Sequence, residues 1–148
     1  MIVRPAEPDD IPALAGIAQR SYAVAFADIL EAEVIEDRDS AYFMARFALA
    51  WKRMLVASSR ETLAGFLLMT DGHIDMLFMD PAAIGQGGGA RLLEKAEALG
   101  AKSLECFRDN QAARRFYERH GWCVAREYER EFEGRSRSFV FYEKSKAT

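Results

Sequence analysis

The sequence predicts an α/β fold in which a mixed, mostly antiparallel twisted sheet has a central parallel pair of strands and helices on both faces. Three apolar segments, 54–58, 62–69 and 73–79, are separated by short polar turns, which indicates an antiparallel meander. The third segment is followed by a helix and then by a strand over 103–107. That succession implies a right-handed crossover and therefore a parallel pair.

The elements before the meander are a short strand and two helices. Residues 2–4 form the strand, and Asp9 or Asp10 caps a helix whose apolar residues recur at three- and four-residue steps. Residues 28–39 carry six acids against one arginine. We interpret them as a solvated acidic connection, and the functional alternative is an electronegative rim that attracts an amine. A second helix is expected over 40–50.

The elements after the meander are two helices, the strand between them and a hairpin. One helix runs to Leu99 with Gly100 as its C-terminal stop, and another covers about 111–120. Strands over 122–132 and 136–142 then form a closing hairpin. An exposed edge of such a hairpin can pair with a second copy, so a homodimer is one expectation.

Length and composition predict one soluble domain over residues 1–148. Half of the residues are hydrophobic, and the net charge of -3 provides no basic field, which argues against nucleic acid as a partner. The N-terminal residues lack the apolar core of a signal peptide, and no apolar run reaches the roughly 20 residues of a membrane span. We therefore expect a cytoplasmic protein without membrane contact.

The two cysteines do not predict a metal site. Cys106 and Cys123 have neither CxxC spacing nor a neighbouring group of histidines, so neither a zinc site nor a disulfide framework is supported. We expect both to be buried thiols and no metal to be bound.

A glycine-rich turn is the strongest functional signal. Four of the ten glycines fall within Gly85-Gln86-Gly87-Gly88-Gly89, directly before a helix. Glycines let a backbone approach a ligand closely, and the free amides and positive dipole end of a helix N-terminus favour a phosphate group. The turn therefore predicts a phosphate-bearing ligand.

Other phosphate motifs fit the turn less well. It satisfies the dinucleotide pattern GxGxxA, with Glu105 at the distance expected for a ribose contact. However, residues 80–84 intervene between strand and glycines, and the chain ends in a hairpin rather than in further parallel strands. A P-loop is excluded because no Gly-Lys-Ser/Thr follows. A turn that binds nothing is the purely structural alternative.

The motifs resemble those of the Gcn5-related N-acetyltransferase (GNAT) superfamily. Pro81, the glycine turn and the pair Leu92-Leu93 are similar to its acyl-coenzyme A signature. A second block, Asn110-x-x-Ala113-x-x-Phe116-Tyr117-Glu118-Arg119-x-Gly121-Trp122, is similar to its following helix, and Val3-Arg4-Pro5-Ala6-x-x-Asp9-Asp10 resembles its first strand and helix. One position departs from the pattern: Ile84 stands where the superfamily usually has Arg or Gln.

The resemblance implies a binding site for acetyl-coenzyme A as co-substrate. The strand before the turn would hold the pantetheine arm and thioester along its edge, and the turn amides would hold the pyrophosphate. The helix after the second strand of the parallel pair would complete the site. The residues expected to bind the coenzyme are Leu77, Phe78, Met79, Ile84, Gly85, Gln86, Gly87, Gly88, Gly89, Ala90, Asn110, Ala113, Phe116 and Tyr117.

The resemblance also implies catalytic roles. Tyr117 occupies the position of the tyrosine that protonates the leaving thiolate. His73 and Asp75, two residues apart on one strand, and Glu105 on the adjacent strand are the candidates for the group that deprotonates the amine.

The function implied is an N-acetyltransferase that moves an acetyl group from acetyl-coenzyme A to a primary amine of a small molecule or peptide, directly in a ternary complex. The alternatives are a catalytically idle coenzyme A-binding or regulatory domain of the same fold and, more remotely, a dinucleotide-binding domain. The acceptor would be shaped by residues 22–39 and 129–138.

Overall fold

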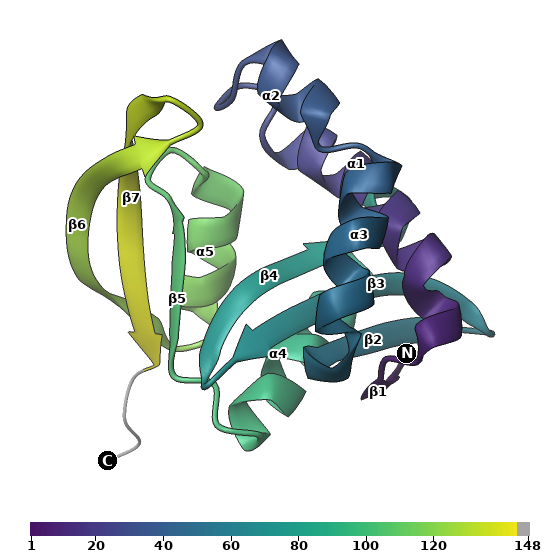
Figure 1. The fold of residues 1–148 in the computed structure, drawn as a ribbon. Coiled ribbons are helices and arrows are strands. Elements are labelled where there is room, and N and C mark those ends of the chain that lie inside the picture. Colours follow the sequence, from purple (N-terminus) through teal and green to yellow (C-terminus); the bar gives the residue numbers. More distant parts are fainter. Residues whose placement is uncertain (145–148) are drawn as a thin grey trace.

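The computed structural model describes residues 1–144, which form a seven-stranded sheet with helices on both faces (Figure 1). The strands are β1 (Ile2–Pro5), β2 (Met54–Ser59), β3 (Thr62–Thr70), β4 (His73–Met79), β5 (Ser103–Phe107), β6 (Trp122–Phe132) and β7 (Arg135–Lys144). The helices are α1 (Ile11–Ala25), α2 (Ala32–Asp37), α3 (Ser40–Ala50), α4 (Gly88–Ala98) and α5 (Gln111–Arg119). Short 3-10 turns cover Pro8–Asp10, Trp51–Arg53 and Pro81–Ala83.

The strand order is β1-β2-β3-β4-β5-β7-β6, and β4 with β5 is the parallel pair. All the other neighbouring strands are antiparallel. The predicted fold class, with its meander, crossover and parallel pair, is therefore confirmed. The order of the last two strands adds a feature that the sequence did not reveal, because β7 lies between β5 and β6 and leaves β6 at the edge.

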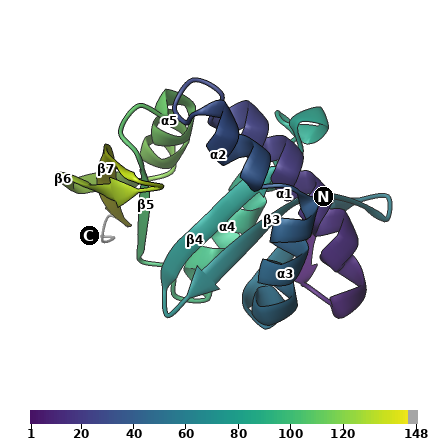
Figure 2. The same ribbon diagram turned by 45° about the horizontal axis from the view of Figure 1, so that its top comes forward.

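Two hydrophobic cores cover the two faces of the sheet (Figures 1 and 2). Helices α1 and α3 pack on one face through residues such as Leu14 and Phe47, and α4 and α5 pack on the other through Leu93 and Tyr117. Successive strand residues alternate between the cores, as the period of a strand requires. Because helices cover both faces of the sheet, a ligand can enter it where two neighbouring strands separate.

The parallel pair separates after two residues. Only His73 with Ser103 and Ile74 with Leu104 are in register, whereas β7 follows β5 along its whole length. Figure 1 shows β4 and β5 together at one end and diverging toward the other. Beyond Ile74, the edge of β4 that faces β5 has no strand partner among residues 1–144.

The acidic segment 28–39 contains a helix, α2, and is tied to the closing hairpin. Glu31 forms ion pairs with Arg135 and Arg137 of β7, the latter at 2.7 Å. At the end of α2, Arg38 lies 2.5 Å from Glu133 in the β6–β7 turn. One of the six acids of the segment, Glu31, is therefore bound to the hairpin, whereas the other five are exposed.

Candidate active site

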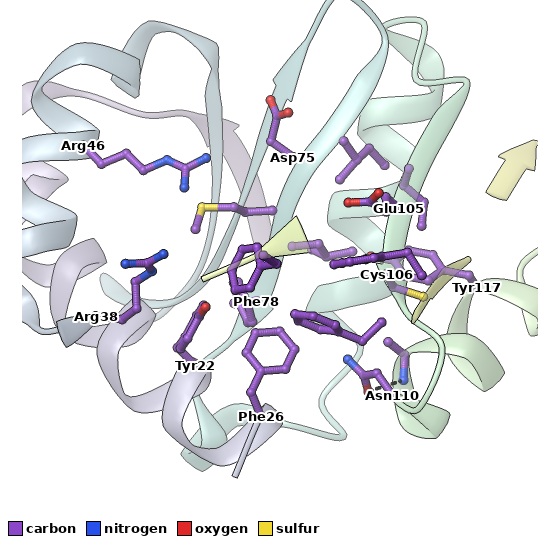
Figure 3. A pocket seen from close by; sticks show the side chains of 18 of the residues that line it. Tyr22, Phe26, Arg38, Arg46, Asp75, Phe78, Glu105, Cys106, Asn110 and Tyr117 are labelled. Atoms are coloured by element: carbon purple, nitrogen blue, oxygen red, sulfur yellow. Dashed lines mark hydrogen bonds between the residues drawn. The ribbon is translucent and has the colours of Figure 1, made fainter. Parts of the chain in front are cut away.

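A cavity of about 230 Å³ lies where β4 and β5 part. Its walls come from α1, α3, both strands, α5 and the β6–β7 hairpin (Figure 3). Aromatic side chains predominate in the lining and include Tyr22, Phe26, Phe43, Phe78, Phe107 and Phe139. Concave sites with apolar walls and a few polar groups are typical of small-molecule binding sites.

The backbone of β4 presents hydrogen-bonding groups to this opening. The Asp80 amide donates to the Ala64 carbonyl at 2.7 Å, which makes this a bonded pair of the β3–β4 ladder. Bonded and non-bonded pairs alternate in an antiparallel ladder, so Phe78 is bonded to β3, whereas Leu77 and Met79 direct their backbone groups away from β3. These two residues thus provide the exposed strand edge at the divide.

Ser21 fixes the end of that edge. It is the one buried polar side chain among residues 1–144, and its Oγ donates a hydrogen bond of 2.9 Å to the Met79 carbonyl. This contact connects α1 to β4 and leaves the Met79 amide and both Leu77 groups facing the divide. A serine on an apolar helix face carries no sequence signal for such a contact.

A β-bulge separates His73 from Asp75. Leu68 pairs with Met76 and Met69 pairs with Ile74, so Asp75 is an extra residue on β4. Bulges commonly re-aim a side chain. The Asp75 side chain lines the cavity and accepts a 2.6 Å hydrogen bond from the Thr70 hydroxyl.

His73 has other partners. Its Nδ1 lies 2.8 Å from the Ser103 hydroxyl, and its ring stacks on Phe141 at 6.0 Å. Unlike Asp75, it does not contribute to the lining of the cavity. The two candidate bases on β4 therefore stand in different surroundings, although regular strand geometry would place them alike.

Glu105 lines the cavity as half of an ion pair. Arg130 donates to its two oxygens at 2.9 and 2.5 Å, and the Tyr128 hydroxyl also donates to it. Burial raises the pKa of Glu105, but these hydrogen bonds outweigh burial and hold it below its ordinary value. A carboxylate bound in this way is a weak base.

Replacing Glu105 with Gln should lower the free energy of unfolding by about 1–2 kcal/mol at neutral pH, because charged hydrogen bonds are lost. The native pKa lies below the unfolded value, so this contribution is complete above the ordinary pKa of 4.5 and disappears as pH falls through the native one. Urea unfolding at about pH 7 and about pH 3.5 measures both effects. Equal acid sensitivity of the variant and the wild type would contradict the assignment.

Tyr117 and Cys106 form the wall of the cavity on the side of α5. Tyr117 is 7% exposed and lines the cavity, and its hydroxyl has no hydrogen-bond partner among residues 1–144. Burial raises the pKa of Tyr117 above its ordinary value, so the phenol stays protonated at neutral pH. Burial also raises the pKa of the Cys106 thiol to about 12.

The glycine turn continues from β4 into α4. Gly85 and Gly87 have φ values of 90° and 84°, and a Cβ added at either would meet no atom within 4 Å. Gly87 is the N-cap of α4, and a Cβ at Gly88 would lie 2.4 Å from Met79. The turn therefore needs glycine for its backbone and leaves open space in front of the helix N-terminus. Ile84, just before it, is 65% exposed.

The remaining predicted binding residues are on or before α5. The side-chain oxygen Oδ1 of Asn110 caps this helix by accepting a 3.2 Å hydrogen bond from the Ala113 amide, and both residues line the cavity. The ring of Phe116 does not line it, but a Cβ added at Gly89 would lie 3.5 Å from that ring. Phe116 thus connects α5 to the first turn of α4.

Three arginines that line the cavity were not predicted as site residues from the sequence. Arg38, Arg46 and Arg130 reach the cavity from the end of α2, from α3 and from β6. Isolated arginines on helices and edge strands are usually solvated, and only the folded chain brings these three to one site. Within residues 1–144, no group of three or more His, Cys, Asp and Glu side chains is placed to hold a metal ion, and no helix is long and apolar enough to cross a bilayer.

The divided parallel pair, the exposed β4 edge and the glycine turn at a helix N-terminus define the fold class of acyl-coenzyme A-dependent acyltransferases. A family model described as an acetyltransferase (GNAT) domain matches residues 27–146. The chain therefore belongs to the GNAT acetyltransferase family.

Solved structures agree with this assignment. A GCN5-related N-acetyltransferase from Rhodopseudomonas palustris is 27% identical, with a TM-score of 0.75 over 97% of this chain and 94% of its own. YjaB from Escherichia coli is 24% identical, with a TM-score of 0.80 over 99% and 100%. The PaiA N-acetyltransferase from Thermoplasma acidophilum, solved with coenzyme A, is 21% identical, with a TM-score of 0.77 over 97% and 98%. No curated protein sequence matches the chain.

Proposed function

We propose that this protein transfers the acetyl group of acetyl-coenzyme A to a primary amine of a small molecule, by direct attack in a ternary complex. The observation that carries the proposal is the cavity at the divide between β4 and β5, which is lined by Tyr117, whose hydroxyl has no hydrogen-bond partner within the described residues. The GNAT family and the coenzyme A bound to the PaiA relative support acetyl-coenzyme A as the donor.

The coenzyme would lie along β4 and end at α4. The pantetheine amides would pair with the free backbone groups of Leu77 and Met79, like an added strand. The amides of residues 85–90 and the dipole of α4 would hold the pyrophosphate. The side-chain oxygen of Asn110 caps α5, so the side-chain nitrogen Nδ2 is left to donate to the pantetheine arm. Ile84 would provide apolar contact in place of the usual polar side chain.

The transfer removes two protons from the ammonium form of the acceptor and supplies one to the thiolate. The amine nitrogen attacks the thioester carbon, the bond between that carbon and sulfur breaks, and the thiolate takes the proton of Tyr117. The proton that the nitrogen loses after attack restores the Tyr117 phenol, directly or through water. Tyr117 suits this role because its phenol stays neutral. The ammonium form of the acceptor must lose a proton before attack. We assign that proton to Asp75, directly or through water, because its carboxylate lines the cavity and has no ion pair within residues 1–144.

Direct transfer predicts that Cys106 is dispensable. A thiol whose pKa is about 12 is almost entirely protonated at neutral pH and is therefore a poor nucleophile. Cys106→Ala should keep kcat within about threefold of the wild type, a change of under 1 kcal/mol in the barrier. Steady-state kinetics measures this. An acetylated Cys106 trapped with acetyl-coenzyme A in the absence of amine would refute direct transfer.

The proposal is tested by free-thiol release from acetyl-coenzyme A with a panel of primary amines, and mass spectrometry identifies the product. Amine-dependent release with formation of the acetamide supports an enzyme. Tight binding of acetyl-coenzyme A without turnover of any amine would instead indicate a catalytically idle domain on the same fold.

A further inference from the structure

The charged side chains of the cavity are distributed unevenly. Figure 3 shows Arg38 and Arg46 on the side of α2 and α3, across the cavity from Glu105, Cys106 and Tyr117. The side where the resemblance places the thioester is therefore separate from a side that carries two guanidinium groups.

Most of the charges in the cavity already have partners. Arg130 is bonded to Glu105, and Arg38 is paired with Glu133 and lies 4.4 Å over the Tyr42 ring. Arg46 has neither an ion pair nor a hydrogen bond within residues 1–144. Arg46 is an exposed residue whose side chain lines the cavity, so within residues 1–144 its guanidinium stays available to a ligand.

The opposite unpaired charge is Asp75. This carboxylate also lines the cavity, and its one side-chain bond among the described residues is from the neutral hydroxyl of Thr70. Within residues 1–144, the cavity lining therefore includes one cation, Arg46, and one anion, Asp75, that have no ion pair. A ligand with both signs of charge satisfies the two groups at once.

From this distribution we infer that the acceptor is a zwitterion, an amine that also carries a carboxylate on an apolar body, as in an apolar amino acid. This inference rests on the proposed acetyl transfer. Arg46 binds the carboxylate, for which the planar fork of a guanidinium is suited. The amine then faces Asp75 and the divide between the strands.

The walls between the charges explain the apolar body. Tyr22, Phe26 and Phe78 line the floor, with ring centroids 4.7 Å apart for Tyr22 and Phe26 and 6.0 Å apart for Phe26 and Phe78. Because these rings carry no charge, this part of the cavity favours an apolar group over a long polar one. The cavity of about 230 Å³ is also small, which suits a single compact side chain.

The same groups disfavour a polycation. A second ammonium group would lie against Arg46, and like charges in a shared site are repulsive. Arg38 is already compensated by Glu133, and Glu31, one of the six acids of the segment 28–39, is bound to Arg135 and Arg137. Discrimination against polyamines thus follows from Arg46 rather than from size.

The test uses matched pairs of amines: phenylalanine with phenethylamine, leucine with 3-methylbutylamine, and methionine with 3-(methylthio)propylamine. Within the pair turned over fastest, the wild type should prefer the carboxylate member by at least roughly tenfold in kcat/KM, as expected for a charged hydrogen bond. Arg46→Gln should remove most of that preference, and Arg46→Lys should restore part of it. Comparing ratios between variants cancels the intrinsic basicity of each amine.

Arg60→Gln is the matched control, because Arg60 is an exposed arginine in the β2–β3 turn that does not line the cavity. It should leave the preference unchanged. Turnover of the neutral members with a preference that Arg46→Gln does not alter would overturn the inference while the acetyltransferase proposal stands. Failure to acetylate any amine, with acetyl-coenzyme A binding checked by calorimetry, would overturn the proposed function itself.

Discussion

Replacing Tyr117 with Phe is expected to lower kcat about a hundredfold, the lower range for loss of a general acid, with no change in the Kd of acetyl-coenzyme A. The substitution removes one hydroxyl that has no hydrogen-bond partner within residues 1–144, so the packing of the ring is preserved. Thiol-release kinetics and calorimetry measure the two quantities. Because burial raises the pKa of Tyr117, the wild-type kcat should not fall through its ionisation below about pH 10.

Tyr142→Phe is the matched control for Tyr117. Tyr142 is also buried, with its ring 6.1 Å from that of Tyr117, but its hydroxyl donates to Glu118 and accepts from Arg114, and it does not line the cavity. Loss of this hydroxyl should cost about 1–2 kcal/mol of stability and little kcat. If Tyr117→Phe keeps full turnover, or if both variants lose it equally, Tyr117 is not the acid.

Replacing Gly87 with Asp should raise the Kd of acetyl-coenzyme A roughly thirtyfold more than Gly87→Asn, a difference of about 2 kcal/mol from like charges in a partly screened site. Both residues tolerate the left-handed backbone of Gly87, at φ 84°, and have nearly the same shape. Only the charge beside the expected pyrophosphate differs between them. Calorimetric titration with acetyl-coenzyme A measures the difference.

Thermal melting distinguishes this loss of coenzyme affinity from unfolding of α4. An aspartate at a helix N-cap stabilises the helix, so Gly87→Asp should melt no lower than Gly87→Asn. The difference in Kd should also shrink as salt rises, because the charges lie at the surface. Equal Kd values for the two variants would mean that no pyrophosphate binds at this helix.

The sequence predicted the elements well where local patterns decide them. The meander, the crossover helix and its stop at Gly100 follow from periodicity and turn chemistry, and β1, α1, α3 and α4 begin and end within a few residues of expectation. The parallel pair was also predicted, but not how early it ends. Pairing with β4 stops at Ile74, whereas β7, on the opposite edge of β5, stays paired along the whole strand, and no local pattern in the sequence marks where the two parallel strands part.

The site was harder to predict because single residues reach it through long-range geometry. In a regular strand His73 and Asp75 would lie on the same face of the sheet, and the bulge at Asp75 breaks that alternation of faces. Glu105 was a candidate base on sequence grounds, but the fold brings Arg130 and Tyr128 of β6 to its carboxylate, and both donate hydrogen bonds to it. Arg46 has no motif at all, and its importance follows only from what faces it across the cavity.

A crystal structure with acetyl-coenzyme A would show whether the thioester lies at the divide between β4 and β5. We expect pantetheine amides bonded to the backbone of Leu77 and Met79, the pyrophosphate on the amides of residues 85–90, and the thioester sulfur within hydrogen-bond reach of the Tyr117 hydroxyl. A coenzyme bound elsewhere, or with its sulfur directed away from Tyr117 and outside the cavity, would contradict this expectation.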